Sequence, residues 1–133
     1  MKLSTRYGVA GIAALAALTG VQWLREMKLP RDAVSDYLLG VLPNFCAAVA
    51  ITFVLLSVLA DQMNLVGYTA ARRRFLFSVA VAGVGLLGWE AFQRTSDNFV
   101  FDYNDVGATL VGLVLSYFVF RLVTPHTPEH PTP

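Results

Sequence analysis

Charged residues are scarce in this chain, and their scarcity excludes an ordinary soluble domain. Asp, Glu, Lys and Arg make up 14% of the 133 residues, whereas 56% are hydrophobic. A soluble domain carries about 25% charged and about 45–50% apolar residues. The net charge of +1, with no basic stripe interleaved with aromatics, gives no indication of nucleic-acid binding. We therefore expect a single membrane domain at this length.

Cysteine and the familiar catalytic motifs are also lacking. Cys46 is the only cysteine, which excludes an intrachain disulfide, and its apolar surroundings favour a small buried hydrophobe over a nucleophile. The sequence contains no Ser-His-Asp set, no metalloprotease helix and no phosphate-cradling glycine loop. His126 and His130 lie four apart in a proline-rich tail that cannot be helical. We therefore expect neither a metal nor a cofactor.

Four long apolar runs separated by polar segments predict an all-α membrane protein, a compact bundle of four transmembrane helices. Each run has about the 17–25 residues needed to cross a bilayer. The first run follows a short basic segment, and we favour a retained span over a cleaved signal peptide. The expected four-span domain covers residues 1–124, with spans at residues 7–24, 37–60, 75–92 and 106–123, and residues 125–133 form a Pro-rich disordered tail.

The polar connectors predict where the helices begin. Ser35 or Asp36 suits the cap of the second span, and Asn104 or Asp105 suits the beginning of the fourth. Residues 61–74 read as a polar loop that ends in three consecutive arginines. Such a cluster can bind anionic headgroups, but we favour a role in fixing topology.

The distribution of Lys and Arg predicts the orientation. Six of them lie at the N-terminus, in the second connector and at the end of the fourth span, whereas the opposite side receives four. Basic residues are enriched on the cytoplasmic side of membrane proteins. We therefore expect both termini in the cytoplasm, a prediction that depends on the arginine triplet.

Polar residues from three spans are expected at similar depth on the outer side. Asn44 lies about 10 Å into the second span, Glu90 lies about 22 Å along the third, and Asp105 begins the fourth. Ionisable groups in membrane spans are expensive and are functional candidates. The predicted ligand-binding set, with no residue assigned to catalysis or to a metal, is Asn44, Glu90, Gln93, Asp102, Asp105 and Thr109.

The acids also have simpler explanations. Glu90 and Arg94 are four residues apart and can pair along the helix, and a packed hydrogen-bond network is favoured over chemistry at Glu90. Asp105 can complement the dipole at a helix N-terminus. Three acids could hold a hard divalent cation, but no recognised loop spacing supports such a site.

Small residues predict close helix packing. Gly85 and Gly112 are the packing positions that we single out, and Ala13 and Ala17 have small-xxx-small spacing on the first span. One polar-to-small stripe of the fourth span should face the bundle interior: Asp105, Thr109, Gly112 and Ser116.

The end of the third span and the start of the fourth carry a pattern that resembles the VanZ-like family. It consists of Glu90-x-x-Gln93, a short loop, Asp102 and Asp105, and then Thr109-x-x-Gly112. Thr109 stands where Asn is usual in the family, and the common Arg of the preceding loop is not clearly present. The resemblance covers the last two spans, roughly a third of the chain.

This resemblance implies a bacterial cytoplasmic-membrane protein that crosses the membrane several times. The family's namesake is associated with resistance to the glycopeptide teicoplanin. Membership would imply binding of an envelope-related or amphipathic ligand in an outward-facing polar pocket, or protection against envelope-directed agents such as lipoglycopeptides. It would not imply catalysis.

Two other classes of function stay open. The chain could be an accessory or assembly subunit whose small-residue faces pack against a membrane-protein partner or a second copy. It could also be a small intramembrane enzyme or proton-coupled transporter that uses Glu90. We rank the last reading lowest, because the other members of a catalytic set are missing. Membrane lipid is an expected partner in every case.

Overall fold

The computed structural model describes residues 1–62, 67–98 and 101–126, and the regular elements in these ranges are four α-helices. Each helix is long and apolar enough to cross a membrane. The shortest has 21 residues, which is about 32 Å at 1.5 Å per residue, against a hydrocarbon core of about 30 Å. The prediction of an all-α chain with four candidate spans is confirmed. The helices are α1 (Leu3–Glu26), α2 (Ala33–Gln62), α3 (Tyr68–Arg94) and α4 (Tyr103–Val123).

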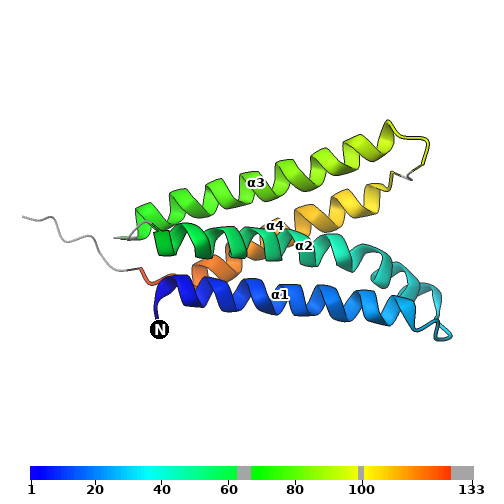
Figure 1. Cartoon of the computed structure of the whole chain (residues 1–133), viewed down its shortest axis with the longest axis horizontal. Coiled ribbons are helices and arrows are strands. Elements are labelled where there is room, and N and C mark those ends of the chain that lie inside the picture. Colours follow the sequence, from blue (N-terminus) through cyan, green and yellow to red (C-terminus); the bar gives the residue numbers. More distant parts are fainter. Residues whose placement is uncertain (63–66, 99–100, 127–133) are drawn as a thin grey trace, which may run out of the picture.

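The second helix is central to the arrangement. α2 contacts all three other helices, whereas α1 packs mainly against α2 and meets α4 over a small area. Figure 1 shows the α1–α2 and α3–α4 connections at one end of the bundle, and the start of α1 and the end of α4 at the other. We call the first the loop end (residues 25–37, 89–98 and 101–105) and the second the termini end (residues 1–8, 57–62, 67–75 and 117–126).

Two helices begin at caps other than those predicted. Asp32 caps α2, since its Oδ1 accepts a hydrogen bond from the backbone N–H of Ser35 at 3.0 Å. Asp102 caps α4 by accepting from the backbone N–H of Asn104 at 2.8 Å, and Asp105 lies in the first turn. Aspartate is among the best N-cap residues. In both cases the cap is an Asp that precedes the predicted one by at least two residues.

The arginine triplet is helical, contrary to the predicted loop. Residues 72–74 lie in the first two turns of α3, which starts at Tyr68. Alanine and arginine are strong helix formers, so the helix continues past the apolar run. Gly67 precedes it with a φ of 87°, a conformation that glycine adopts at little cost. The basic cluster is therefore held on a helix at the termini end.

Aromatic rings pack tightly at the termini end. The Phe75 and Phe120 rings are stacked with centroids 4.4 Å apart, and the Tyr7 ring lies 6.2 Å from that of Phe120. The Tyr7 hydroxyl forms a 2.8 Å hydrogen bond with Thr124 Oγ1, which satisfies the polar tip of a fully buried side chain. The core cluster consists of Tyr7, Val49, Phe53, Leu56, Ala71, Phe75 and Phe120.

Glycines allow α2 to approach two of its neighbours closely. A Cβ on Gly112 of α4 would lie 2.6 Å from the Phe45 carbonyl oxygen, and one on Gly11 of α1 would lie 2.9 Å from Val54 Cγ2. Gly112 therefore occupies a packing position of the kind predicted. Gly85 differs, because a Cβ there would meet nothing within 4 Å, and Ala17 is likewise exposed.

The stripe predicted on the fourth span does face inward. Thr109, Gly112 and Ser116 are all buried, and Asp105, the member of the stripe nearest the loop end, is half-buried. The Ser116 hydroxyl donates to the Gly112 carbonyl of its own helix at 2.9 Å. The stripe thus leads from the middle of the bundle to the acids of the loop end. The tail predicted over residues 125–133 lies, except for its first two residues, outside the described residues.

Candidate functional site

The end of α3 places one carboxyl group inside the loop end of the bundle. Glu90 is only 3% exposed, although it lies one turn from the end of the helix. With the Gln93 amide turned so that both of its polar atoms find partners, its nitrogen donates to Glu90 Oε2 at 3.2 Å and its oxygen accepts from Trp89 Nε1 at 2.7 Å. The i, i+3 spacing of Glu90 and Gln93 on one helix face explains why their side chains meet.

The start of α4 adds two further carboxyl groups. The charges of Asp105 and Asp102 both act on Glu90, which places the three groups within electrostatic range of one another. Asn44, from the early part of α2, lies close enough to Asp105 for its side-chain amide to act on that carboxyl group. The cluster therefore draws on α2, α3 and α4, as the depth argument from the sequence supposed.

In the described part of the chain, the hydrogen bond that links the Thr109 side chain to this cluster stays within α4. That side chain is fully buried, and its hydroxyl donates to the Asp105 carbonyl oxygen at 3.0 Å. Although the Thr109 hydroxyl already donates its proton to this carbonyl, its oxygen can still accept a hydrogen bond. Thr109 therefore lies one helical turn from Asp105, on the side toward the middle of α4.

The pairing of Glu90 with Arg94 is not observed. Both residues lie in the described part of α3, and no ion pair joins them there. The Arg94 guanidinium instead lies 5.8 Å from the centroid of the Phe101 ring, a cation–π arrangement. The simplest explanation of Glu90, a surface salt bridge along its own helix, is therefore wrong.

Sequence reasoning missed two contributors to the loop end. Arg25, in the last turn of α1, acts electrostatically on Asp105. The Tyr37 hydroxyl donates to Asn104 Oδ1 at 3.4 Å, which links α2 to the start of α4. The expected topology placed Arg25 on the same side as the acids and could have identified it. Nothing in the spacing indicated the contact of Tyr37.

A shallow groove of about 390 Å³ runs between α2 and α4 beside the cluster. Its polar members, Tyr37 and Asn104, lie at the loop end, and the remaining lining is mostly apolar. For metals the arrangement is less suitable. Within residues 1–62, 67–98 and 101–126, no group of three His, Cys, Asp or Glu side chains is placed to hold an ion. The groove is lined by Tyr37, Val41, Leu42, Phe45, Tyr103, Asn104, Gly107, Ala108 and Val111.

Comparison of the chain with protein-family models, with curated proteins and with solved structures produced no match.

Proposed function

We propose that this chain is a VanZ-like protein of the bacterial cytoplasmic membrane that binds an amphipathic, envelope-related ligand at its loop end. The observation that carries the proposal is Glu90, a carboxyl group that is 3% exposed and lies within electrostatic range of Asp102 and Asp105. Withdrawing a carboxyl group from water is costly, and such residues in membrane spans are functional candidates. The fold alone gains little from it.

The chemistry of the cluster supports a particular kind of headgroup. Carboxylates accept hydrogen bonds and attract cations, and charge-assisted bonds are roughly twice as strong as neutral ones. Asp105 and Glu90 therefore suit a ligand whose polar head carries ammonium or hydroxyl donors. The groove between α2 and α4 offers an apolar surface for a lipid tail beside them.

The orientation follows from charge. The termini end carries six of the lysines and arginines, and we place it in the cytoplasm by the enrichment of basic residues on that side. The loop end and its acids then face the cell exterior. A ligand of the envelope, such as a lipid-tailed glycopeptide or a lipid-linked envelope component, reaches the cluster from that side, and its capture protects the cell.

The experiment compares acids inside and outside the cluster. Glu90→Gln and Asp105→Asn each remove one carboxylate and keep the side-chain shape, so we expect protection against a lipoglycopeptide to be lost at unchanged membrane levels. Asp97→Asn is the matched control, since Asp97 is exposed in the α3–α4 connection. Equal susceptibility of the cells that express the wild type and the Glu90→Gln variant would reject the proposal.

A second candidate, an accessory subunit that acts through helix packing, is favoured by one observation. A Cβ added to Gly85 or Gly88 of α3 would have no neighbour within 4 Å, and Ala13 and Ala17 on α1 are exposed. Small exposed residues let another helix approach closely. Gly85→Leu and Ala17→Leu should then abolish co-purification of a membrane-protein partner or a second copy, and unchanged co-purification would exclude this role.

A further inference from the structure

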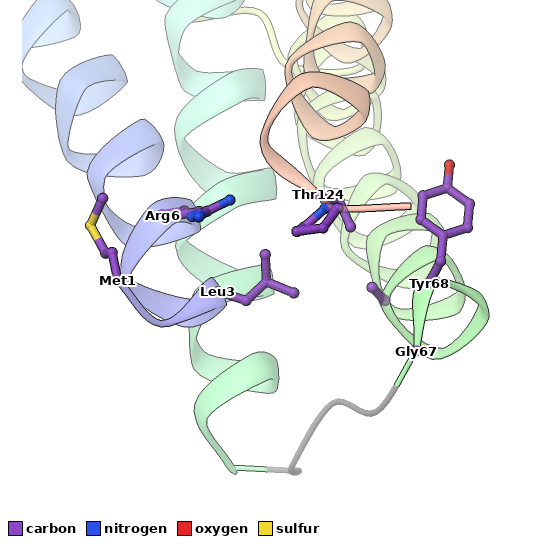
Figure 2. Close-up of a pocket in the computed structure, with 8 residues that line it drawn as sticks. Met1, Leu3, Arg6, Gly67, Tyr68 and Thr124 are labelled. Carbon is purple, nitrogen blue, oxygen red and sulfur yellow. The ribbon is translucent and has the colours of Figure 1, made fainter. Parts of the chain in front are cut away.

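A cavity of about 190 Å³ lies at the termini end, far along the bundle from the acids. Figure 2 shows that it lies where the starts of α1 and α3 meet the end of α4. Arg6, Tyr68 and Thr124 are among its lining residues. Because the cavity is formed by the ends of three candidate spans, it lies at the depth of the lipid headgroups when those helices cross a bilayer.

Arg6 supplies the charge in this cavity. Its side chain is half-buried, and Figure 2 shows the guanidinium directed from α1 toward Thr124. Nη1 donates to the Val123 carbonyl oxygen at 3.3 Å, which uses one of the five N–H donors of the group. Over the part of the chain that the structure describes, this is the hydrogen bond that the Arg6 side chain makes, so the other donors are left for a ligand.

The surroundings add positive potential. Among the described residues of the termini end, Asp61 is the one acid against six lysines and arginines. The cavity also receives the start of α3, where Gly67 has no side chain to cap the helix and the first turn contains no acid. The positive end of the helix dipole therefore acts in the same direction as the Arg6 charge.

We propose that this cavity binds the phosphate group of an anionic membrane lipid. The Arg6 guanidinium donates to two phosphate oxygens in its planar, bidentate geometry, and the lipid tails run along the apolar outer surface of the helices. This site is separate from the acid cluster and does not depend on the function proposed for it. The competing explanation is that Arg6 serves only to cap the C-terminal end of α4.

The test measures lipid retention by native mass spectrometry of the full chain in detergent, with phosphatidylglycerol and phosphatidylcholine as probes. Arg6→Gln keeps an N–H donor for Val123 but removes the charge. A hydrogen bond to a charged group contributes about 1.5–3 kcal/mol, so we expect the preference for phosphatidylglycerol to fall about tenfold or more. Arg6→Lys keeps the charge but loses the planar fork, and it should lose a smaller part of the preference.

Arg121→Gln is the matched control. Arg121 lies at the same end on α4, is exposed, and directs its guanidinium to the Tyr117 hydroxyl at 3.3 Å. We expect this variant to change the preference for phosphatidylglycerol over phosphatidylcholine by less than about twofold, because an exposed surface charge contributes little. If Arg6→Gln and Arg121→Gln lost the preference for phosphatidylglycerol to the same extent, the preference would come from the overall surface charge, and the proposal would be overturned.

Two further results would also overturn it. An unchanged preference in both Arg6 variants would leave Arg6 with the capping role alone. Inorganic phosphate is the second probe, and displacement of phosphatidylglycerol by millimolar phosphate would assign the site to a free anion. The circular dichroism of each variant is compared with that of the wild type; if Arg6→Gln does not fold, the comparison of Arg6→Lys with Arg121→Gln decides the outcome.

Discussion

The two ends of the bundle are held together by different kinds of interaction. At the termini end the rings of Tyr7, Phe75 and Phe120 are buried and stacked, and the tyrosine hydroxyl is hydrogen-bonded to Thr124. At the loop end the Tyr37 hydroxyl of α2 bonds to Asn104 of α4, and Glu90 is buried within electrostatic range of Asp102 and Asp105. The termini end therefore contributes more to the stability of the fold, whereas the loop end holds groups that are costly to bury.

Charge separates the two ends as well. In the described ranges the termini end has six basic residues and one acid, whereas the loop end has four basic residues and seven acids. A basic end favours contact with anionic headgroups, and an acidic end favours cationic or hydrogen-bond-donating ligands. The same chain thus offers two chemically opposite surfaces, one at each end of its four candidate spans.

The largest expected effect is loss of the aromatic core. Phe120→Ala removes a fully buried ring that stacks on Phe75 and also contacts Tyr7 and Tyr68. We expect a loss of about 3–5 kcal/mol in the free energy of unfolding, measured by denaturation in detergent micelles. Phe118→Ala, at a position 57% exposed, is the control and should change it little. Similar losses for the two variants would contradict the assignment of stability to the termini end.

A smaller effect is expected where α4 meets α2. Gly112→Ala would bring a Cβ to 2.6 Å from the Phe45 carbonyl oxygen, so the helices must separate, at about 1–3 kcal/mol. Gly85→Ala is the contrast: with no neighbour within 4 Å it should stabilise the helix by about 0.5–1 kcal/mol. Thermal unfolding of the two variants in the same detergent should shift in opposite directions, and shifts of the same sign would show that Gly112 is not a packing contact.

Removal of a single hydroxyl tests the polar component of the termini end. Tyr7→Phe leaves the stacked ring in place but breaks the 2.8 Å hydrogen bond to Thr124. We expect a loss of about 0.5–1.5 kcal/mol, the usual net value of such a bond, from denaturant titration in micelles. Thr124→Val should cost a similar amount, and the double variant should not add to it if the two groups act on each other.

The smallest effect concerns pH at the loop end. Hydrogen bonds donated by Ser35 lower the pKa of the exposed Asp32 carboxyl below its ordinary value. A group with a lowered pKa in the folded state contributes stability above its unfolded pKa, and this contribution is lost as the pH falls through the folded value. In a titration followed by carboxyl NMR, the midpoint of Asp32 should therefore lie below the ordinary pKa of an aspartate side chain. Ser35→Ala should raise that midpoint because it removes the hydroxyl donor. An unchanged midpoint would contradict this description of the α2 cap.

The four helices could be predicted from the sequence because each contains a long, nearly uninterrupted apolar run, which is typical of a spanning helix. The sequence was not sufficient for the helix ends, since hydropathy marks the apolar part of a helix rather than the helix itself. The segment 72–74 continues α3 because its arginines favour helix, and Asp32 caps α2 because its side chain reaches the Ser35 N–H. Both are local effects of single side chains, and hydropathy averaged over a stretch of sequence does not detect them.

The candidate site was partly predictable for a similar reason. Depth along each span placed Asn44 and Glu90 near Asp105, and the period of a helix placed Thr109 and Gly112 on one inward face. Small-residue spacing could not distinguish Gly112, which meets α2, from Gly85, which meets no helix. That difference depends on how the helices cross, and a one-dimensional pattern does not contain it.

The most direct test of the division between the two ends measures stability and protection on the same variant. Glu90→Gln removes a buried charge-bearing group and keeps Gln93 as a hydrogen-bond neighbour. We predict an unchanged or higher melting temperature in detergent, together with lost protection of expressing cells against a lipoglycopeptide. A melting temperature lowered as far as that of Phe120→Ala, or protection equal to the wild type, would contradict the account.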